Sequence, residues 1–249
     1  MKPQIPWLRV FVEGVVIVGS ILLAFGIQAW WDEAQERAEE QEILMGLETD
    51  FAANLAQLRG VVSVHDWAQD MVARLEAMSD ADLAAVPPDS VGLYARAMGA
   101  SRSFDARDGT LDAVMASGTL SVIADPRLRD LLVEWKGRVE DAGEEARDLR
   151  AVSQRVAERN AQLGGPWRLT FDEAAPLEGV SGNAAARLAA VSEAMGRYPP
   201  ANLAALAKDT DLMGLVRWKV YAGRWYLLEL RPLAEHADSV LALVQANRR

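Results

Sequence analysis

The first thirty residues contain the longest apolar run of the chain. The run spans residues 10–31, and its only strongly polar interruptions are Glu13 and Gln28. About twenty such residues are what a helix needs to cross roughly 30 Å of hydrocarbon. Tryptophans flank the run on both sides, as is typical of the two membrane–water interfaces. The pattern predicts a transmembrane helix within residues 1–31, with the interface anchors Trp7, Arg9 and Trp30.

One narrow face of this predicted helix carries residues spaced three and four apart. They are Glu13, Ile17, Ser20, Ala24, Gln28 and Trp31, and we call them the span stripe. Small residues let two membrane helices approach closely, and polar side chains hydrogen-bond between them. The span stripe therefore predicts a contact between copies of the chain, or the lining of a pore. A simpler interpretation of Glu13 is an interfacial acid paired with Arg9, one turn earlier.

Polarity rises after Trp31, but nothing there breaks a helix. Apolar residues again recur at three and four: Leu44, Leu47, Phe51, Leu55, Leu58, Val62 and His65. This spacing predicts a stalk helix over residues 32–78 that packs on the body of the protein. Gly46 and Gly60 should weaken it locally. We interpret His65 as a core histidine because it lies on the apolar side of the pattern.

Helix start and stop signals divide the remaining residues, 79–249. Pro87 and Pro88 separate two short helices, and Asp125 followed by Pro126 is typical of a helix start. That helix should run to about Leu163, and a last one should begin near Thr210 and be kinked or interrupted by Pro232. The expected fold class is all-α: an N-terminal transmembrane helix continuing into a long stalk helix, then an antiparallel helical bundle.

Several finer expectations follow from the same signals. Thr110 should cap a short helix that Gly118 ends in a left-handed conformation. Residues 183–197 should form a helix, and the irregular stretches 101–109 and 164–183 are the candidate recognition loops. The last helix should turn six residues toward the core, with its aromatics in the interior rather than in a stacking platform. These six are Leu212, Leu215, Trp218, Tyr221, Trp225 and Leu228.

Composition and charge narrow the class of protein. The 249 residues carry a net charge of −10, which argues against a nucleic-acid partner because phosphate binding needs a basic face. The chain has no Cys and therefore no disulfides. Lys2 and Arg9 precede the predicted span and only Arg37 closely follows it, which favours a cytoplasmic N-terminus and an exported body. A cleaved signal peptide is the alternative, although Ile27 stands where such a cleavage site needs a small residue.

Catalytic signals are missing from the sequence. It contains no nucleotide-binding, zinc-protease, nucleophile-elbow or calcium-loop motif. With only His65 and His236, a histidine-based metal site or triad has few possible arrangements. We therefore predict no catalytic residue, no cofactor and no metal. A helical hydrolase using either histidine with a carboxylate is the enzymatic alternative.

Two segments resemble a known family. They are EGVVIVGSILLAFGIQAWWDEAQERAEEQEILMGLETDFAANL and GTLDAVMASGTLSVIADPRLRDLLVEW. Together they resemble the DUF6090-type family of uncharacterised membrane-anchored bacterial proteins. Gly14, Gly19 and Gln28 depart from that family's pattern. The resemblance implies an anchor in the bacterial inner membrane with a periplasmic body, and it transfers no catalytic residue.

Two functional hypotheses result. The first is a self-associating, single-pass membrane protein that acts as a scaffold, sensor or partner-binding module, with the lipid bilayer, its own copies and an unknown protein as partners. The second is a homo-oligomeric cation channel in which Glu13 forms an acidic ring and the acids at 32–42 concentrate ions. Conductance that changes with Glu13→Gln would favour the channel.

Overall fold

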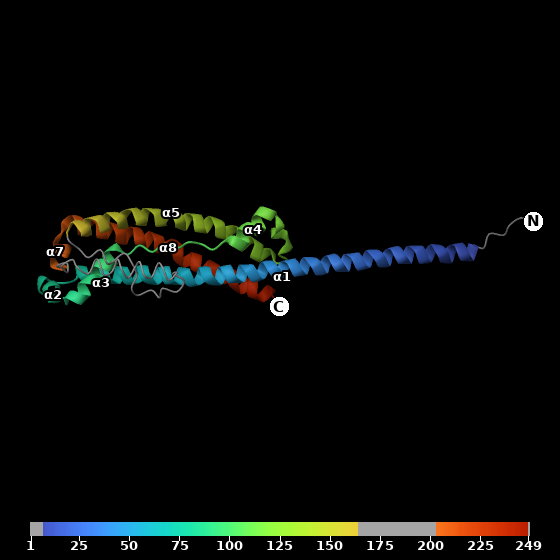
Figure 1. Ribbon diagram of the computed structural model, residues 1–249, viewed down its shortest axis with the longest axis horizontal. Coiled ribbons are helices and arrows are strands. Elements are labelled where there is room, and N and C mark those ends of the chain that lie inside the picture. The colour runs from blue at the N-terminus through green and yellow to red at the C-terminus, as the bar shows by residue number, and fades with distance from the viewer. Residues whose placement is uncertain (1–6, 164–202, 249) are drawn as a thin grey trace, which may run out of the picture.

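The computed structural model describes residues 7–163 and 203–248, and these residues form helices and no strands (Figure 1). The all-α prediction is confirmed. The expectations for a helix over 183–197 and for the loop 164–183 lie outside the described residues.

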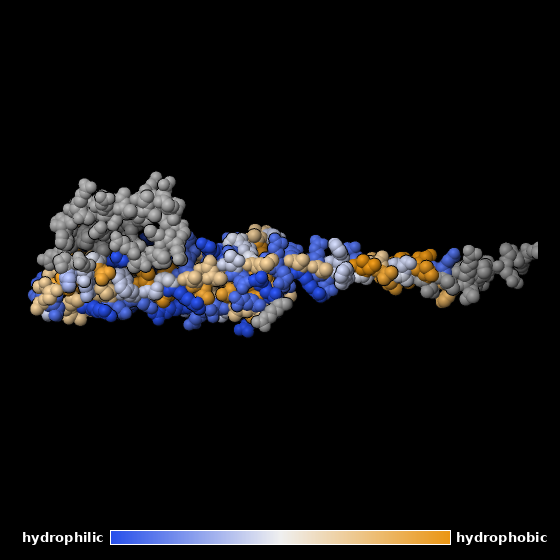
Figure 2. Space-filling model, turned by 60° about the horizontal axis from the view of Figure 1, so that its bottom comes forward, coloured by the Kyte–Doolittle hydropathy of each residue, from blue (hydrophilic) through white to orange (hydrophobic). Residues whose placement is uncertain are grey.

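One continuous helix, α1 (Trp7–Glu76), joins the apolar N-terminal segment to the body. Its first part extends alone from the bundle, and its second part packs within it (Figure 1). By length and composition α1 is the one helix of the described residues that could cross a membrane, and its apolar window is wholly unburied. The apolar side chains near the free end stand exposed in a band along the rod (Figure 2).

Three long helices build the body. They are the second part of α1, α5 (Pro126–Gln162) and α8 (Thr210–Asn247), and α8 packs against both of the others. Contacts at the two ends show that α8 runs antiparallel to α1, since Arg217 pairs with Glu76 and Arg248 with Glu48. It also runs antiparallel to α5, since Asp209 pairs with Arg159 and Asn247 bonds Asp125. Such antiparallel packing lets all three helices bury an apolar stripe along their whole length.

Short helices close both ends of the bundle. At the end far from the N-terminus lie α2 (Asp80–Ala85), α3 (Pro88–Gly99) and α7 (Leu203–Lys208). At the near end lie α4 (Gly109–Ser117) and the 3-10 turn η1 (Thr119–Val122) (Figure 1). An extended segment, residues 100–108, runs along the bundle from α3 to α4 and connects the two ends.

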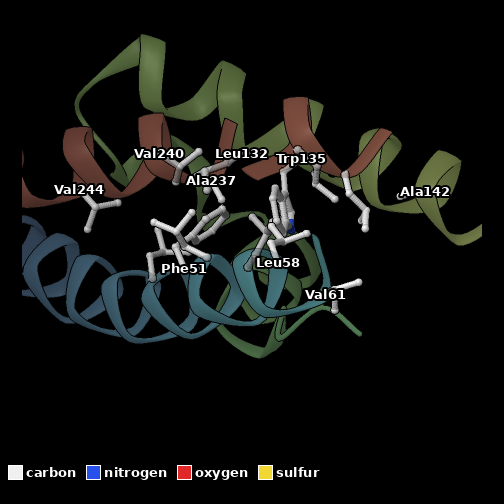
Figure 3. Packing of buried hydrophobic residues seen from close by; sticks show 14 of the residues in the cluster. Phe51, Leu58, Val61, Leu132, Trp135, Ala142, Ala237, Val240 and Val244 are labelled. Carbon is white, nitrogen blue, oxygen red and sulfur yellow. The ribbon is translucent and has the colours of Figure 1, made fainter. Parts of the chain in front are cut away.

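The interior consists of two apolar clusters, one toward each end. The cluster nearer the free part of α1 contains the fully buried Trp135, together with Phe51 and Leu58 of α1 and Ala237 and Val240 of α8 (Figure 3). The other cluster joins the far part of α1 to α3, α7 and the start of α8. The residues predicted for the stalk pattern belong to this interior: Leu44, Leu47, Phe51, Leu55, Leu58 and His65 are buried, with Val62 partly buried.

The predicted helix signals have mixed outcomes. The Asp125 side chain accepts hydrogen bonds from the backbone N–H groups of Arg127 and Leu128, which confirms the cap of α5. Gly118 ends α4 with a left-handed φ of 73°, as predicted. Thr110 does not cap α4, which begins at Gly109; its backbone N–H instead donates to the Asp50 carboxylate on α1. Packing against α1 thus replaces a local cap.

Pro232 does not interrupt α8, which continues from Thr210 to Asn247. A helical proline removes one hydrogen bond to the residue four positions earlier. Here Pro232 and Leu228 both lie on an exposed face, where water can bond the free carbonyl. The proline therefore costs less at this position than it would on a buried face.

Gly46 is required by the contact between α1 and α4. A Cβ at this position would lie 2.7 Å from both Cγ2 and Oγ1 of Thr110, whereas a Cβ at Gly60 would meet nothing within 4 Å. We expect Gly46→Ala to destabilise the protein by about 1–3 kcal/mol because Thr110 and the start of α4 must move. Thermal unfolding of the full chain in detergent, followed by circular dichroism, measures the change.

Gly60→Ala is the matched control for this prediction. The same substitution in the same helix, without a clash, should stabilise the protein by about 0.5–1 kcal/mol through helix propensity. Equal effects of the two substitutions would contradict the close-approach role of Gly46.

Candidate functional site

The span stripe lies on the part of α1 that extends beyond the body. Ile17 is 59% and Trp31 is 62% exposed, so both are available to lipid or to another helix. Two of its polar residues have partners within α1: Ser20 Oγ donates to the Val16 carbonyl at 2.8 Å, and Gln28 Nε2 donates to Asp32 Oδ1 at 2.9 Å. The side chains of Trp7 and Arg9 lie outside the described residues, so their role as interface anchors stays a prediction.

The span stripe does not continue into the buried face of the stalk. Leu44 follows Gln28 by 16 residues, which places it about 160° farther around a helix of roughly 100° per residue. The buried residues of the stalk contact α5 and α8 of the same chain. Contacts between copies through the stripe would therefore be confined to the free part of α1, and the roles of the stripe in contact or pore lining stay predictions.

Segment 101–109 lies along the long helices and is bonded to them, while Ser101, Arg102, Asp105 and Arg107 stay exposed, so its role as a recognition loop stays a prediction. Asn54 of α1 accepts from the Arg107 N–H at 2.7 Å and donates to its carbonyl at 3.0 Å. The Tyr226 hydroxyl of α8 accepts from the Phe104 N–H at 2.8 Å. Asp108 Oδ1 accepts from Trp135 Nε1 at 2.9 Å, and Lys136 pairs with its other oxygen. These bonds pair backbone groups of the segment with side chains of the long helices, which is a structural role.

Both histidines bond backbone carbonyl groups. His65 Nε2 lies 2.7 Å from the Arg102 carbonyl oxygen, and His236 Nε2 lies 2.8 Å from that of Leu131. His65 is 2% and His236 is 7% exposed, and the His236 ring stacks on Trp135. Burial lowers the pKa of His65, which keeps its ring neutral near pH 7. In the described part of the chain no group of three His, Asp or Glu side chains could hold a metal ion.

Lys219 is the least expected buried group. Its side chain is 3% exposed on the inner face of α8, and Nζ donates to the Ala97 carbonyl at 2.9 Å. That carbonyl belongs to the last turn of α3, where the helix offers it no N–H partner. Burial lowers the pKa of Lys219 to about 7. Lys219 therefore stabilises the C-terminal end of α3 through this hydrogen bond, whereas burial of its charged form lowers the stability of the fold.

The outer face of α8 carries a row of exposed apolar side chains. Trp218 is 57%, Tyr221 50%, Trp225 48% and Leu228 59% exposed. Trp218 stacks on Tyr221 with ring centroids 5.3 Å apart, and Tyr221 meets Trp225 edge-on at 6.1 Å. We call these four residues the aromatic face.

The prediction that these four residues point inward is wrong. Of the six residues predicted for the core, Leu212 is buried and Leu215 is partly buried. The face that α8 buries includes Val216, Lys219, Gly223 and Tyr226 instead. In the sequence, Lys219 and Gly223 interrupt the apolar pattern of this buried face.

A groove lies between α1 and α4. The residues that line it include Glu39, Glu42, Ile43, Gly46 and Val114. Glu40, next to it, accepts a hydrogen bond from the Ala124 N–H and so holds the chain before α5. Some of the acids after the span are thus used in docking the near end of the body.

Comparison of the chain with protein-family models, with curated proteins and with solved structures finds no match. The resemblance to the DUF6090-type family therefore stays an expectation.

Proposed function

We propose that the protein is a single-pass membrane protein whose helical body serves as a self-associating scaffold that presents a binding surface to a protein partner. The proposed membrane is the bacterial inner membrane, with the N-terminus in the cytoplasm and the body in the periplasm. The observation that carries the proposal is the dual use of α1, which is bare and apolar in its first part and part of the body's core in its second.

The continuity of α1 supports a rigid presentation. Because no break separates the span from the stalk, the body cannot swing freely on a linker. Body contacts begin at Glu40 and Gln41, about 13 Å beyond Trp31 at 1.5 Å per residue. Glu76, at the far end, lies about 65–70 Å beyond Trp31 by the same rise. The body is therefore a rod standing on the membrane.

The aromatic face supports binding of another protein chain. Tryptophan, tyrosine and arginine are the residues that most often dominate the binding energy of protein interfaces. Arg217 and Arg231, beside this face, pair with Glu76 and Asp66 of α1, which places it about 50–65 Å beyond the span. At that height its tryptophans cannot belong to the interfacial belt of the membrane that holds α1.

Anchoring and orientation are tested on the full chain expressed in a bacterium. We expect the protein to stay in the membrane pellet after alkaline carbonate washing, since a spanning helix is not removed by breaking surface contacts. The absence of native Cys makes single-cysteine labelling unambiguous. A membrane-impermeant maleimide added to spheroplasts should label Gly137→Cys on α5 but not Gln4→Cys before the span.

Two results would overturn this part of the proposal. One is release of the protein by carbonate. The other is labelling of the N-terminal cysteine with protection of the body cysteine, which would place the body in the cytoplasm.

A further inference from the structure

We propose that the aromatic face of α8 binds a second copy of the chain, with the two α8 helices parallel. The inference rests on the proposed function, because anchoring both copies in one membrane fixes their common direction. It identifies the self-association surface as a part of the body and not only of the span.

The spacing of the exposed residues matches a two-helix contact. Trp218, Tyr221, Trp225 and Leu228 follow one another at three, four and three residues, which is the a/d pattern of a coiled coil. The exposed Gly214 occupies the preceding d position. The residues that face the protein's own core, such as Lys219, Tyr226 and Leu230, occupy the other positions of the same heptads. The helix therefore has two apolar faces, and among the described residues only one of them is covered.

Charges beside the aromatic face select the parallel arrangement. In a parallel pair, a residue at g lies beside the e residue five positions later in the partner helix. Arg224 is at g and Glu229 is at e, so two such pairs of opposite charge form around the two-fold axis. In an antiparallel pair g faces g, and the three g residues Arg217, Arg224 and Arg231 would face one another.

Arg224 and Glu229 also have no charged partner among the described residues of the monomer. Arg217 and Arg231 bind Glu76 and Asp66 of α1. Arg224 and Glu229 are exposed and have no ion pair or side-chain hydrogen bond in the part of the chain that the structure describes. The two unpaired charges thus stand where a parallel second copy would pair them.

The size of the aromatic face explains why membrane anchoring matters. Three half-exposed aromatic side chains and one leucine leave on the order of 400 Å² of apolar surface, which is the size of a functional patch on a monomer. Two such patches together fall below the roughly 1,200 Å² of a stable independent interface. Anchoring in one membrane raises the effective concentration of copies and so favours pairing.

Disulfide crosslinking of full-length protein in membrane vesicles tests the contact. Gly214→Cys keeps all four apolar residues, and its Cβ meets nothing within 4 Å in the monomer. Two d positions face each other in a parallel pair, so mild oxidation should convert this variant to a covalent dimer. Gly137→Cys on α5 is the matched control, because it is also an exposed helical glycine with open space around it. We expect several-fold more dimer from Gly214→Cys than from Gly137→Cys.

Charge substitutions in the Gly214→Cys background test the orientation. Arg224→Glu should lower the dimer fraction to that of the control, because it places two acids side by side in the pair. Adding Glu229→Arg restores opposite charges and should restore crosslinking. Recovery in the double variant also shows that the single variant had not simply unfolded.

Three results would overturn the inference: equal dimer from the two cysteine positions, no effect of Arg224→Glu, or a crosslinked product whose mass is not twice that of the chain. The carbonate wash is applied to the same vesicles. If the protein resists the wash and Gly214→Cys gives no excess dimer, the inference fails while the proposed anchoring stands.

Discussion

Replacing Lys219 by methionine is expected to stabilise the folded protein near pH 7 and to destabilise it above pH 10.5. The folded pKa of Lys219 is about 7, whereas the ordinary value of 10.5 applies to the unfolded chain. Between these values the unfolded state binds more protons, so the stability of the wild type should rise with pH across this window. Below pH 7 both states are protonated, and the whole cost, about 4–5 kcal/mol, is present.

The sign of the effect changes because Lys219 also makes a hydrogen bond. Methionine keeps the length of the side chain but leaves the Ala97 carbonyl without its partner, at a cost of about 1–3 kcal/mol. Near pH 7 the removed charge outweighs this loss, so Lys219→Met should gain about 1–4 kcal/mol. Above pH 10.5 the amine is neutral in both states, and only the lost hydrogen bond remains.

Urea unfolding of the full chain in detergent, repeated from pH 7 to about pH 11, measures this difference on both sides of the sign change. Lys208→Met is the control, because Lys208 is an exposed lysine paired with Asp80 and should contribute within about 1 kcal/mol. A pH dependence in Lys219→Met that equals that of the wild type would contradict the buried-charge explanation. The lowered pKa of His65 acts in a different window, since it reduces stability only as pH falls below 6.5.

Trp135→Ala is expected to destabilise the protein by about 3–5 kcal/mol, the range for removing a large aromatic side chain from a packed core. Trp135 is fully buried, and its ring centroid lies 4.9 Å from that of Phe51 and 6.1 Å from that of Phe104. Its Nε1 also donates to Asp108, which fixes the start of α4. The substitution therefore removes a core contact and a link to segment 100–108 together.

Trp225→Ala is the matched control for Trp135→Ala. Trp225 is 48% exposed on the aromatic face, so its removal from dilute protein in detergent should change stability by about 1 kcal/mol or less. Trp135→Phe should keep most of the packing and lose the hydrogen bond, and should fall between the two. Equal losses from Trp135→Ala and Trp225→Ala in urea unfolding would contradict the assignment of Trp135 to the core and Trp225 to the surface.

Local and periodic features of the fold could be predicted from the sequence. The apolar run, the helix-start signal at Asp125 and Pro126, and the left-handed Gly118 each depend on neighbouring residues only. The stalk pattern from Leu44 to His65 could also be predicted, because an amphipathic helix buries its apolar stripe regardless of which helices pack against it. The all-α class follows from these features.

The choice between two stripes of α8 could not be predicted in this way. Trp218, Tyr221, Trp225 and Leu228 form an uninterrupted apolar stripe, and yet the stripe that contains Lys219 and Gly223 is the buried one. Gly223 offers little bulk toward Gln69 and Leu149, and Lys219 finds the free carbonyl of Ala97. Both reasons lie in other helices, so no pattern within α8 contains them.

The sequence by itself determined where the long helices of the described residues lie and which segment is apolar enough to cross a membrane, because helix periodicity, capping and hydropathy act over a few neighbouring residues. Only the tertiary structure decided that segment 100–108 is held by Asn54 and Tyr226, that Gly46 admits Thr110, and that α8 leaves its aromatic face uncovered. Those outcomes depend on contacts between residues far apart in the chain, where the best total packing and hydrogen bonding of all helices outweighs the preference of any one of them.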